Sequence, residues 1–480
     1  MYSKFGQFID GKWQPSEKNE TYEVINPATE EIIGNASKAT KNDVQKALKS
    51  SEKGFQIWKK TPAWQRSYKI RKIADLMRER KKDLAKWLAL EVGKPLVEGE
   101  GEVGGAADIF EWNAEETKRI FGQTVESRFE DTRVQVIYQP VGVVAALIPW
   151  NFPIILAARK ISTALAAGCS VIVKPDVITP GAVMELMNII NDAGIPPGVV
   201  NLLSGDPEQV SNELISSNIV KKVSITGSTR VGKLILKKAA DKVQRVTMEL
   251  SGHAPFIVFE DSNIDKVTDM AITSKYRNNG QVCISPTRFY IHESKKDDFT
   301  KTFIEKTKKL KIGDGLKEGT NLGPITTKKR LEEIEKLVEK TKKEGGNILY
   351  GGKRPAGFNK GYFYEPTIID NVKDNFTIMT EEPFGPITPI TTFKKFDEVI
   401  ERANKHDCGL AGYVCTNSME KAFKASEQLQ TGVVAVNTPV VATAETPFGG
   451  IKQTGYGREG GTVGIKDYLN IKYTHLGLSG

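Results

Sequence analysis

Cysteine and histidine are scarce in this sequence. Of 480 residues, four are cysteine and four are histidine. They are Cys169, Cys283, Cys408, Cys415, His253, His292, His406 and His475. No CxxC pair is present and these residues do not cluster along the chain, so neither a zinc site nor a disulfide framework is indicated. We expect no metal, and a reducing compartment in which at most one or two thiols carry chemistry.

Long apolar segments are also missing. No stretch approaches the ~18–20 uncharged residues of a membrane-spanning helix, and the N-terminal MYSKFGQFIDGKW has no apolar signal-peptide core. The composition, 39% hydrophobic and 26% charged, is ordinary for a globular chain and excludes a disordered one. We therefore expect a cytoplasmic location and no membrane partner.

The net charge is positive, but the basic residues do not cluster along the chain. A net charge of +9 arises from 68 Lys and Arg against 59 Asp and Glu. The basic residues mostly alternate with acidic ones, as in KKRLEEIEKLVEKTKKEGG from Lys328, and mixed charges at helical spacing stabilise exposed helices. Zinc-finger spacing, aromatic RNA-binding motifs and basic arms are absent. We predict no nucleic-acid partner.

The order of predicted elements indicates an α/β protein. Apolar residues at three- and four-residue spacing predict helices over 43–49, 66–91 and 102–121. After Thr132, Val/Ile-rich strands alternate with amphipathic helices, once up to about residue 250 and again from Ala254, which is typical of parallel sheets covered on both faces. Helices in the second half are predicted at 265–278, 296–310, 326–344, 396–405 and 418–430, and the tail 468–476 alternates like an edge strand. At ~100–200 residues per domain, we expect two or three domains.

A dinucleotide-binding turn is suggested, although the fingerprint GxGxxG is absent. Gly227 and Ser228 lie between a predicted strand and a predicted helix, where N–H groups and the helix dipole can hold a pyrophosphate. The alternative is an ordinary glycine turn. Lys174 ends another strand, at the carboxyl edge where doubly wound sheets bind ligands, unless it is a solvated surface lysine.

Three further positions carry groups suited to acyl chemistry. Cys283 follows a glycine closely and offers a thiol, which needs a nearby base or dipole to become nucleophilic. Glu249 ends a strand where the two halves meet, so its carboxylate can act as a general base. Asn151 lies between two prolines, and its amide can donate to an oxyanion. Plainer interpretations are a buried core thiol, a surface glutamate and an asparagine that caps the next helix.

Taken together, the motifs identify a family. PWNFP, KP followed by TP, TGST, MELSG, GQVC, EEPFGP and PFGGIKQTGYGREGG occur in this order over residues 149–461. The sequence thereby resembles the aldehyde dehydrogenase superfamily from Ile25 to the tail. Its YRNNGQVCISPTRF, ELSGHAP and TGYGREGG segments resemble the succinate-semialdehyde and 2-oxoglutarate-semialdehyde dehydrogenases.

The resemblance implies an architecture. We expect a Rossmann-type, parallel-sheet cofactor domain from residues 1–120 and 141–250, and a second α/β catalytic domain from residues 251–435. A small β extension from residues 121–140 and 458–480 is expected to mediate oligomerisation. A homodimer or a homotetramer is therefore predicted.

The resemblance also implies roles for the acyl-chemistry residues. Cys283 is the expected nucleophile towards the aldehyde, and the Asn151 amide and the Cys283 N–H hold the resulting oxyanion. Glu249 is expected to activate the water that hydrolyses the thioester. A coenzyme A-acylating enzyme is disfavoured because Glu249 is present. A cofactor-free thiol hydrolase and a non-catalytic protein are the alternatives from other classes.

The cofactor expected from the resemblance is NAD or NADP. Its predicted contacts are Trp150, Lys174, Gly227, Ser228, Glu382 and Phe384. Many NAD-using relatives have a Glu where this chain has Val177. Loss of that carboxylate removes repulsion against a 2′-phosphate and leaves Lys174 to pair with it, so we hypothesise that NADP is accepted.

The substrate expected from the resemblance is a small semialdehyde. Arg159 and Arg277 match the arginines that bind the distal carboxylate, and guanidinium offers the paired donors this requires. An ion pair on a helix surface is the alternative for each. Succinate semialdehyde is the first expectation, followed by 2-oxoglutarate or glutarate semialdehyde and then neutral or betaine-type aldehydes. Ala442 replaces a carboxylate-binding Ser of some relatives, and Ser285 replaces a second loop Cys, so no redox disulfide is expected.

Overall fold

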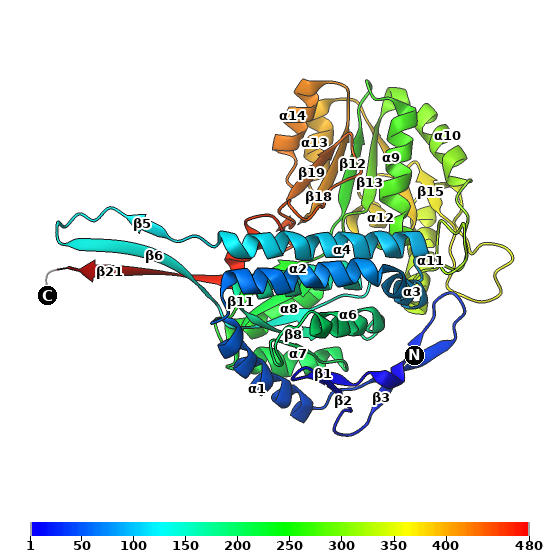
Figure 1. Cartoon of the computed structure of the whole chain (residues 1–480). Helices are drawn as coiled ribbons and strands as arrows, with labels where there is room; N and C mark the ends of the chain where they lie inside the picture. The colour runs from blue at the N-terminus through cyan, green and yellow to red at the C-terminus, as the bar shows by residue number, and fades with distance from the viewer. Residues whose placement is uncertain (1, 479–480) are drawn as a thin grey trace.

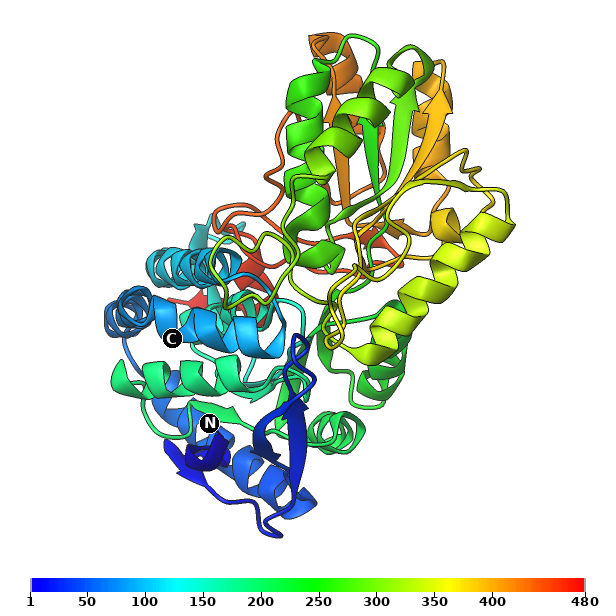
Figure 2. The same cartoon turned by 90° about the vertical axis from the view of Figure 1, so that its right-hand side faces the viewer.

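A computed structural model describes residues 2–478 and contains two α/β bodies with a β arm that projects from one of them (Figures 1 and 2). The first body is built on a seven-stranded sheet in the order β11-β10-β7-β8-β9-β1-β2. Its strands are β1 (Gln7–Ile9), β2 (Lys12–Gln14), β7 (Val143–Leu147), β8 (Ser170–Lys174), β9 (Val200–Leu202), β10 (Val220–Thr226) and β11 (Arg245–Glu249). Strands β7 to β11 pair in parallel, and β1 is antiparallel to both of its neighbours.

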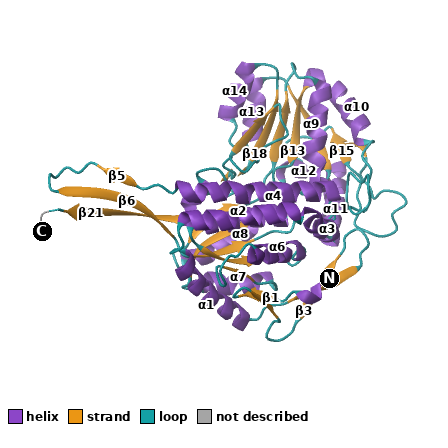
Figure 3. Cartoon of the chain, viewed as in Figure 1, coloured by secondary structure: helices purple, strands orange, loops and turns teal. Residues whose placement is uncertain are grey.

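Helices cover both faces of this first sheet (Figure 3). They are α1 (Lys41–Trp58), α2 (Ala63–Glu79), α3 (Lys81–Glu91), α4 (Leu96–Glu116), α5 (Pro153–Ala167), α6 (Gly181–Asp192), α7 (Pro207–Ser216) and α8 (Thr229–Ala240). All residues of β7 and β8 are buried, which explains why these strands are almost continuously apolar in sequence. A hairpin of β3 (Thr21–Ile25) and β4 (Ile32–Ser37) lies beside this body.

Several of the predicted helix boundaries need correction. The helix predicted over 43–49 is longer and spans Lys41–Trp58, and the helix predicted over 102–121 begins earlier, at Leu96. The single helix predicted over 66–91 is two helices, α2 and α3, because the backbone of Arg80 leaves the helical region with φ −98° and ψ 19°. Helix α4 ends at Glu116 rather than at residue 121, since a 3-10 turn at Thr117–Arg119 leads into the arm. The break at Arg80 and the end of α4 at Glu116 are changes in backbone geometry, which the spacing of apolar residues does not predict.

The second body contains a second seven-stranded sheet, in the order β14-β15-β16-β13-β12-β18-β19. Its strands are β12 (Ala254–Val258), β13 (Pro286–His292), β14 (Asn347–Tyr350), β15 (Thr367–Asp370), β16 (Ile387–Phe393), β18 (Ala411–Cys415) and β19 (Val433–Val436). Its helices are α9 (Ile264–Tyr276), α10 (Lys296–Thr307), α11 (Lys328–Lys343), α12 (Thr377–Thr380), α13 (Phe396–Asn404) and α14 (Met419–Gln428). Only β14 is antiparallel to its neighbour, so the predicted α/β alternation is confirmed here as well.

The helix predicted over 265–278 ends two residues early. Helix α9 stops at Tyr276, and the 3-10 turn Arg277–Gly280 that follows contains Asn278 and Asn279 with φ of 47° and 54°. Asparagine is one of the few residue types that tolerates this left-handed region. The turn redirects the chain away from the axis of α9 and towards the sheet of the first body.

The arm is a three-stranded antiparallel sheet in the order β21-β6-β5. It consists of β5 (Gln123–Val125), β6 (Thr132–Pro140) and β21 (Leu469–Gly477), and extends away from the two bodies (Figure 1). Strand β21 pairs with β6 along its whole length, from Leu469 opposite Pro140 to Gly477 opposite Thr132. The edge strand predicted in the tail is thus present. Among residues 2–478, no helix is long and apolar enough to cross a membrane.

Candidate active site

The carboxyl edge of the first sheet brings distant predicted residues together. Leu147 at the end of β7 lies opposite Lys174 at the end of β8, and Thr226 at the end of β10 lies opposite Glu249 at the end of β11. The loops that follow these strands carry Asn151 and Gly227. Ligands of doubly wound sheets bind outside this edge, so the topology itself points to the site.

A cavity of about 590 Å³ lies over this edge. It is lined by Trp150, Lys174, Gly227, Ser228 and residues of α7 and α8, among them Pro207, Val231 and Leu234. Ser228 caps α8 by accepting a hydrogen bond from the Val231 N–H at 3.3 Å. A Cβ on Gly227 would meet no atom closer than 3.9 Å, so the backbone at the start of the helix is not crowded by its neighbours. A helix N-terminus next to an apolar slot fits a dinucleotide with its pyrophosphate at the helix end.

Lys174 is buried, which rules out the interpretation as a solvated surface lysine. Burial lowers the pKa of its ammonium group, and Asp176 and Asp206 oppose this effect. Val177 does not line the dinucleotide-sized cavity. It lines a neighbouring cavity of about 610 Å³ that also contains Lys38, Lys328 and Lys329. The same lining contains two acidic residues, Glu23 and Asp206, so the three lysines leave a small excess of positive charge near Val177.

A smaller cavity of about 170 Å³ joins the two bodies. Its lining contains Trp150, Asn151, Gly227, Ser228, Cys283, Glu382 and Phe384. These residues are predicted from the sequence for catalysis and for cofactor contact, and they come from loops of both bodies. Arg330 also lines this cavity and was missed, because a charged residue at the start of an exposed helix carries no distinguishing signal.

Cys283 lies in the loop between the Arg277–Gly280 turn and β13. Burial raises the pKa of its thiol to about 12, and the nearby carboxyl groups of Glu382 and Glu249 act in the same direction. Backbone N–H groups of Cys283 and Ile284 partly counteract them. In the protein alone the sulfur is therefore a thiol, and a proton must leave before it can attack.

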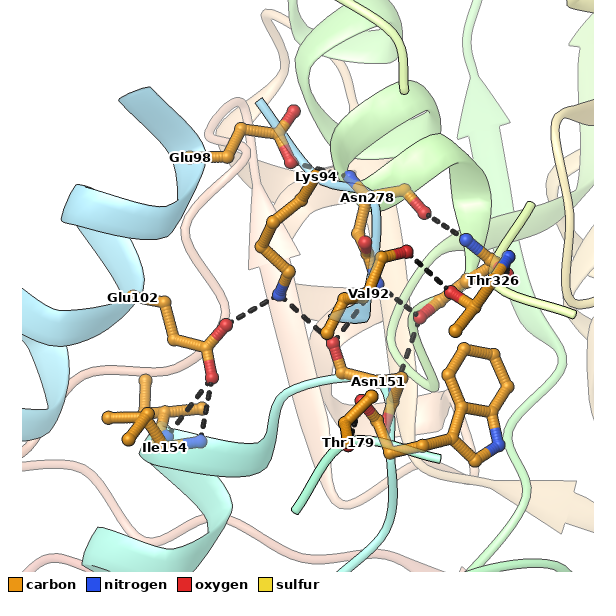
Figure 4. A network of polar contacts seen from close by, with 12 residues as sticks. Val92, Lys94, Glu98, Glu102, Asn151, Ile154, Thr179, Asn278 and Thr326 are labelled. Carbon is orange, nitrogen blue, oxygen red and sulfur yellow. Dashed lines mark hydrogen bonds and ion pairs between the residues drawn. The ribbon is translucent and has the colours of Figure 1, made fainter. Parts of the chain in front are cut away.

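Asn151 is 5% exposed, and its side-chain amide donates to the main-chain oxygen of Gln281 at 3.1 Å. An amide carries two N–H donors, so the second one remains for a ligand oxygen. Asn151 does not cap α5. The carboxylate of Glu102 does so by accepting from the N–H groups of Ile154 and Ile155 at 3.0 and 3.2 Å (Figure 4). The interpretation of Asn151 as a helix cap is therefore wrong.

Glu249 is 2% exposed, so the surface interpretation is also wrong. Neither carboxylate oxygen has a hydrogen-bond partner within residues 2–478. Burial raises the pKa of this carboxyl group well above its ordinary value, and the charge of Glu459 raises it further, against the effects of Lys160 and Arg159. A buried carboxyl group with free oxygens and a raised pKa has the properties of a general base.

The surroundings of Glu249 include a buried ion pair that the sequence did not reveal. The Nζ of Lys160 donates to Oε1 of Glu459 at 2.5 Å, and Ser224 donates to the same oxygen at 3.3 Å. Lys160 lies on α5 and Glu459 in the TGYGREGG segment. Charged residues far apart in the chain give no sequence signal of pairing, which is why neither was selected.

Glu382 and Phe384 lie in the EEPFGP turn. Burial raises the pKa of Glu382 to about 8. Hydrogen bonds from Ser251 and from the Gly252 N–H counteract this rise. The Gly252 N–H donates to Glu382 Oε1 at 3.4 Å. Phe384 has a φ of 43°, in the left-handed region that a bulky residue rarely adopts. Its ring contacts Trp150 edge to face, with centroids 5.5 Å apart. Such strain is typical of functional turns.

The two predicted substrate arginines are placed differently. Arg159 is 3% exposed on α5, its Nη1 has no hydrogen-bond partner within residues 2–478, and its guanidinium carbon is 4.8 Å from the centre of the Phe448 ring. Arg277 is exposed, and its guanidinium carbon is 4.6 Å from the centre of the Phe152 ring. In the described part of the chain neither arginine forms an ion pair, so the alternative of a surface ion pair is wrong for both.

The remaining cysteines and histidines lie elsewhere. Cys169 and Cys415 are buried, and Cys408 is partly buried in a two-residue strand, β17 (Cys408–Gly409), which pairs with β20 (Ile451–Lys452). His253 is buried and shares a hydrogen bond of 2.7 Å with Thr287. No group of three or more His, Cys, Asp or Glu side chains within residues 2–478 is placed to hold a metal ion.

Comparison with known proteins agrees with this geometry. The family model described as "Aldehyde dehydrogenase family" matches residues 13–474. The chain is 41% identical over 466 residues to a glutarate-semialdehyde dehydrogenase of Pseudomonas putida, covering 97% of this chain and 96% of that protein. It is 39% identical over 470 residues to the NADP(+) succinate-semialdehyde dehydrogenase of Escherichia coli, covering 98% and 97% of the two chains. The crystal structure of an E. coli NADP-dependent enzyme matches with a TM-score of 0.97 at 39% identity, covering 98% of each chain.

These similarities extend over nearly the whole chain, as the order of the motifs predicted. The α/β fold with two mainly parallel sheets is shared with the solved structures, which confirms the predicted fold class. The chain belongs to the aldehyde dehydrogenase family, and it is an oxidoreductase of the type that converts aldehydes to acids with NAD or NADP.

Proposed function

We propose that this enzyme oxidises succinate semialdehyde to succinate, with glutarate semialdehyde as the alternative substrate. Written in full, the aldehyde, water and NAD(P)+ give the carboxylic acid, NAD(P)H and a proton. The observation that carries this proposal is the buried guanidinium group of Arg159, which has an unpartnered Nη1 and lies close enough to Cys283 for their charges to interact. Arg277, over the ring of Phe152 next to Asn151, is a second guanidinium group without an ion pair in residues 2–478. Relatives named as succinate- and glutarate-semialdehyde dehydrogenases support it.

The residues for the dinucleotide are Trp150, Lys174, Gly227, Ser228, Glu382 and Phe384, which line the two adjoining cavities. When bound, the dinucleotide supplies the hydride acceptor at its nicotinamide ring. Gly227 and the amide end of α8 would hold the pyrophosphate. Lys174 would hold the adenosine ribose and Glu382 the nicotinamide ribose, and the edge-to-face pair of Trp150 and Phe384 would shield the site from water.

Cys283 would begin the reaction. Its thiol gives a proton to solvent water, the sulfur forms a C–S bond to the aldehyde carbon, and the C=O electron pair moves onto oxygen. The second N–H of the Asn151 amide and the N–H of Cys283 would donate to this oxyanion, a role in which one donor is worth roughly 3–4 kcal/mol. Loss of hydride from the same carbon then leaves a thioester on Cys283.

Glu249 would complete the reaction. Its free, buried carboxylate removes a proton from water, whose oxygen attacks the thioester carbon. The C–S bond breaks, the sulfur takes the electron pair, and the carboxylic acid is released. The raised pKa of Glu249 makes its carboxylate more basic and so better suited to this proton transfer.

The cofactor preference also belongs to this proposal. We infer that NADP is accepted, because Val177 provides no carboxylate against a 2′-phosphate, and Lys38, Lys328 and Lys329 line the same cavity as Val177. Asp176, next to Lys174, acts against this preference. At least roughly a hundredfold higher kcat/KM with NAD than with NADP, about 2.7 kcal/mol of discrimination, would make the inference wrong.

The domain roles follow from the same assignment. Residues 1–120 and 141–250 would bind the cofactor, residues 251–435 would carry the catalytic thiol, and residues 121–140 and 458–480 would mediate oligomerisation through the arm. The fully paired β6 and β21 give that arm a rigid sheet on which a second copy can dock. We propose a homodimer or homotetramer in the cytoplasm.

A steady-state screen tests the substrate and the cofactor together. Succinate, glutarate and 2-oxoglutarate semialdehydes, butanal and betaine aldehyde would each be assayed with NAD and with NADP. We expect the highest kcat/KM for a carboxylated aldehyde. Equal values for a carboxylated aldehyde and its uncharged analogue would reject the semialdehyde assignment, and no dinucleotide reduction with any aldehyde would reject the dehydrogenase assignment.

A further inference from the structure

A second buried ion pair lies beside Asn151. The side chains of Lys94 and Glu102 are both 0% exposed, and Lys94 Nζ donates to Glu102 Oε2 at 2.5 Å. Lys94 belongs to the short turn between α3 and α4, and Glu102 to α4 itself. Burial lowers the pKa of Lys94, and the Glu102 carboxylate counteracts that effect.

Both members of this pair contact the segment that carries Asn151 (Figure 4). Lys94 Nζ donates to the main-chain oxygen of Asn151 at 3.0 Å and lies 3.8 Å from the centre of the Phe152 ring. Through its second oxygen, Glu102 accepts the first free N–H groups of α5, from Ile154 and Ile155. The ion pair therefore holds the chain at Asn151 itself and again three residues later.

The same carbonyl connects the pair to the loop of Cys283. Asn278 Nδ2 donates to the Asn151 oxygen at 3.1 Å and to the Gln281 oxygen at 3.2 Å. The side-chain amide of Asn151 donates to that Gln281 oxygen as well. Asn278 is itself held by Glu98, which accepts its N–H at 2.8 Å. Lys94 and Asn278 thus donate to the same acceptor, the main-chain oxygen of Asn151. Asn278 also holds the loop that carries Cys283, through the Gln281 oxygen.

We propose that Lys94 and Glu102 are positioning residues that fix the Asn151 amide relative to Cys283, and so set the strength of the oxyanion contact. This inference rests on the role proposed for Asn151. Charge-assisted hydrogen bonds are short and directional, so they restrain a donor better than apolar packing would. A buried ion pair is seldom needed for stability alone, because apolar residues of similar volume often serve as well.

The test uses a reaction that forms an oxyanion without dinucleotide. With 4-nitrophenyl acetate, the Cys283 thiol would lose its proton to solvent and its sulfur would attack the ester carbon. A C–S bond would form, and the C–O bond would break as 4-nitrophenolate leaves with the electron pair. The burst of nitrophenolate reports acylation directly. We expect Lys94→Met to slow this burst by up to ~10²-fold, the effect of a misplacement of about 1 Å.

A double-mutant cycle separates positioning from general damage. If Lys94 acts through Asn151, Lys94→Met should change the acylation rate by less than ~3-fold in an Asn151→Ala background, because coupled residues are not additive. Alkylation of Cys283 by iodoacetamide forms no oxyanion, so its rate should not change in Lys94→Met. The double variant Lys94→Met/Glu102→Gln leaves no unpaired buried charge and should reproduce the loss if the single variant folds poorly.

Glu91→Gln is the matched control. Glu91 is also a buried carboxylate at a helix N-terminus, where it accepts the N–H groups of Gly181 and Ala182 at 2.7 and 3.3 Å, but α6 carries no residue of the site. Its acylation rate should equal that of the wild type.

Three outcomes would overturn the inference. They are an equal fall in acylation rate from Lys94→Met in the wild-type and Asn151→Ala backgrounds, a parallel fall in the alkylation rate, or an unchanged acylation rate in Asn151→Ala itself. An enzyme that acylates as expected but reduces no dinucleotide with any aldehyde would reject the proposed function and leave this inference standing.

Discussion

The main-chain oxygen of Cys283 occupies the place that a side chain on Gly252 would need. An ideal Cβ at Gly252 would lie 2.1 Å from that oxygen, far inside van der Waals contact. Gly252 follows β11 in the first body, and Cys283 precedes β13 in the second. The loop that carries Cys283 therefore packs directly against the backbone of the ELSG motif. This close contact explains why residue 252 is a glycine.

Gly252→Ala should displace the nucleophile loop. The added methyl group cannot be accommodated by a rotamer change, because its neighbour is backbone, and overpacking of this kind costs roughly 1–3 kcal/mol. We expect lower thermal stability together with at least a tenfold loss in kcat, measured by calorimetry and by dinucleotide reduction. Gly227→Ala is the matched control for stability, since a Cβ there would meet no atom closer than 3.9 Å. Wild-type activity in Gly252→Ala would contradict the seating of the loop.

Glu249→Gln should separate the two halves of the reaction. The amide has the shape of the carboxylic acid but cannot accept a proton from water, so thioester hydrolysis should slow ~10²–10⁴-fold. Formation of the thioester should persist, giving one equivalent of NAD(P)H per site in the first turnover. Stopped-flow absorbance measures this burst and the slow phase after it. Loss of the burst with no slow phase would place Glu249 in the first half instead.

Arg277→Ala and Arg159→Ala should weaken binding of a carboxylated aldehyde. A hydrogen bond to a charged group contributes ~1.5–3 kcal/mol, so KM should rise roughly 10- to 150-fold with a smaller change in kcat. The values for butanal should stay near those of the wild type. Arg354→Ala, which removes an arginine paired with Glu335 on the surface, is the control. Equal losses with both aldehydes would indicate a structural role for the arginines.

Val177→Glu should lower the use of NADP. The new carboxylate would face the 2′-phosphate, and we expect kcat/KM for NADP to fall at least ~10-fold, about 1.4 kcal/mol, while the value for NAD stays constant or rises. Val177→Gln has the same length without the charge and should leave the NADP value largely unchanged. If both variants lost NADP use equally, side-chain volume rather than charge would be the cause.

Alkylation of Cys283 should depend steeply on pH. Because its thiol pKa is raised to about 12 by burial and by nearby carboxyl groups, only a small thiolate fraction exists at neutral pH. Below the pKa that fraction increases ~10-fold per pH unit, so the iodoacetamide rate in dinucleotide-free enzyme should keep rising between about pH 6 and 9. Cys283→Ser provides the background from the partly buried Cys408. A plateau near neutral pH would show that the thiol is already ionised.

The fold was largely predictable because its signals are local. Buried parallel strands such as Val143–Leu147 are continuously apolar, and their helices are amphipathic, so the alternation and the two halves are visible in the sequence. The misplaced boundaries, at Arg80 and at Asn278, depend on single φ and ψ angles. Such angles depend on tertiary contacts, and the spacing of apolar residues in the sequence does not predict them.

Residues of the candidate site were predictable only where they lie in a recognisable sequence motif. Cys283, Glu249 and Asn151 lie in short, ordered motifs, and the structure brings their loops to one sheet edge. Glu102 lies in a helix with several acidic residues that has the same appearance as an exposed face, and Lys94 lies in a short turn where a lysine is usually solvated. Their burial and pairing depend on how α4 packs against α5, which is a property of the assembled body and not of either segment.

The ion pair of Lys160 and Glu459 has a consequence for synthesis of the protein. The two residues are 299 positions apart, and both are buried beside Glu249. All strands of the first sheet exist once Glu249 has been made, but Lys160 then lacks its carboxylate, and an uncompensated buried charge costs roughly 3–5 kcal/mol. The first body therefore reaches its full stability only when nearly the whole chain has left the ribosome. A nascent chain stalled before Glu459 would remain open to chaperones and proteases.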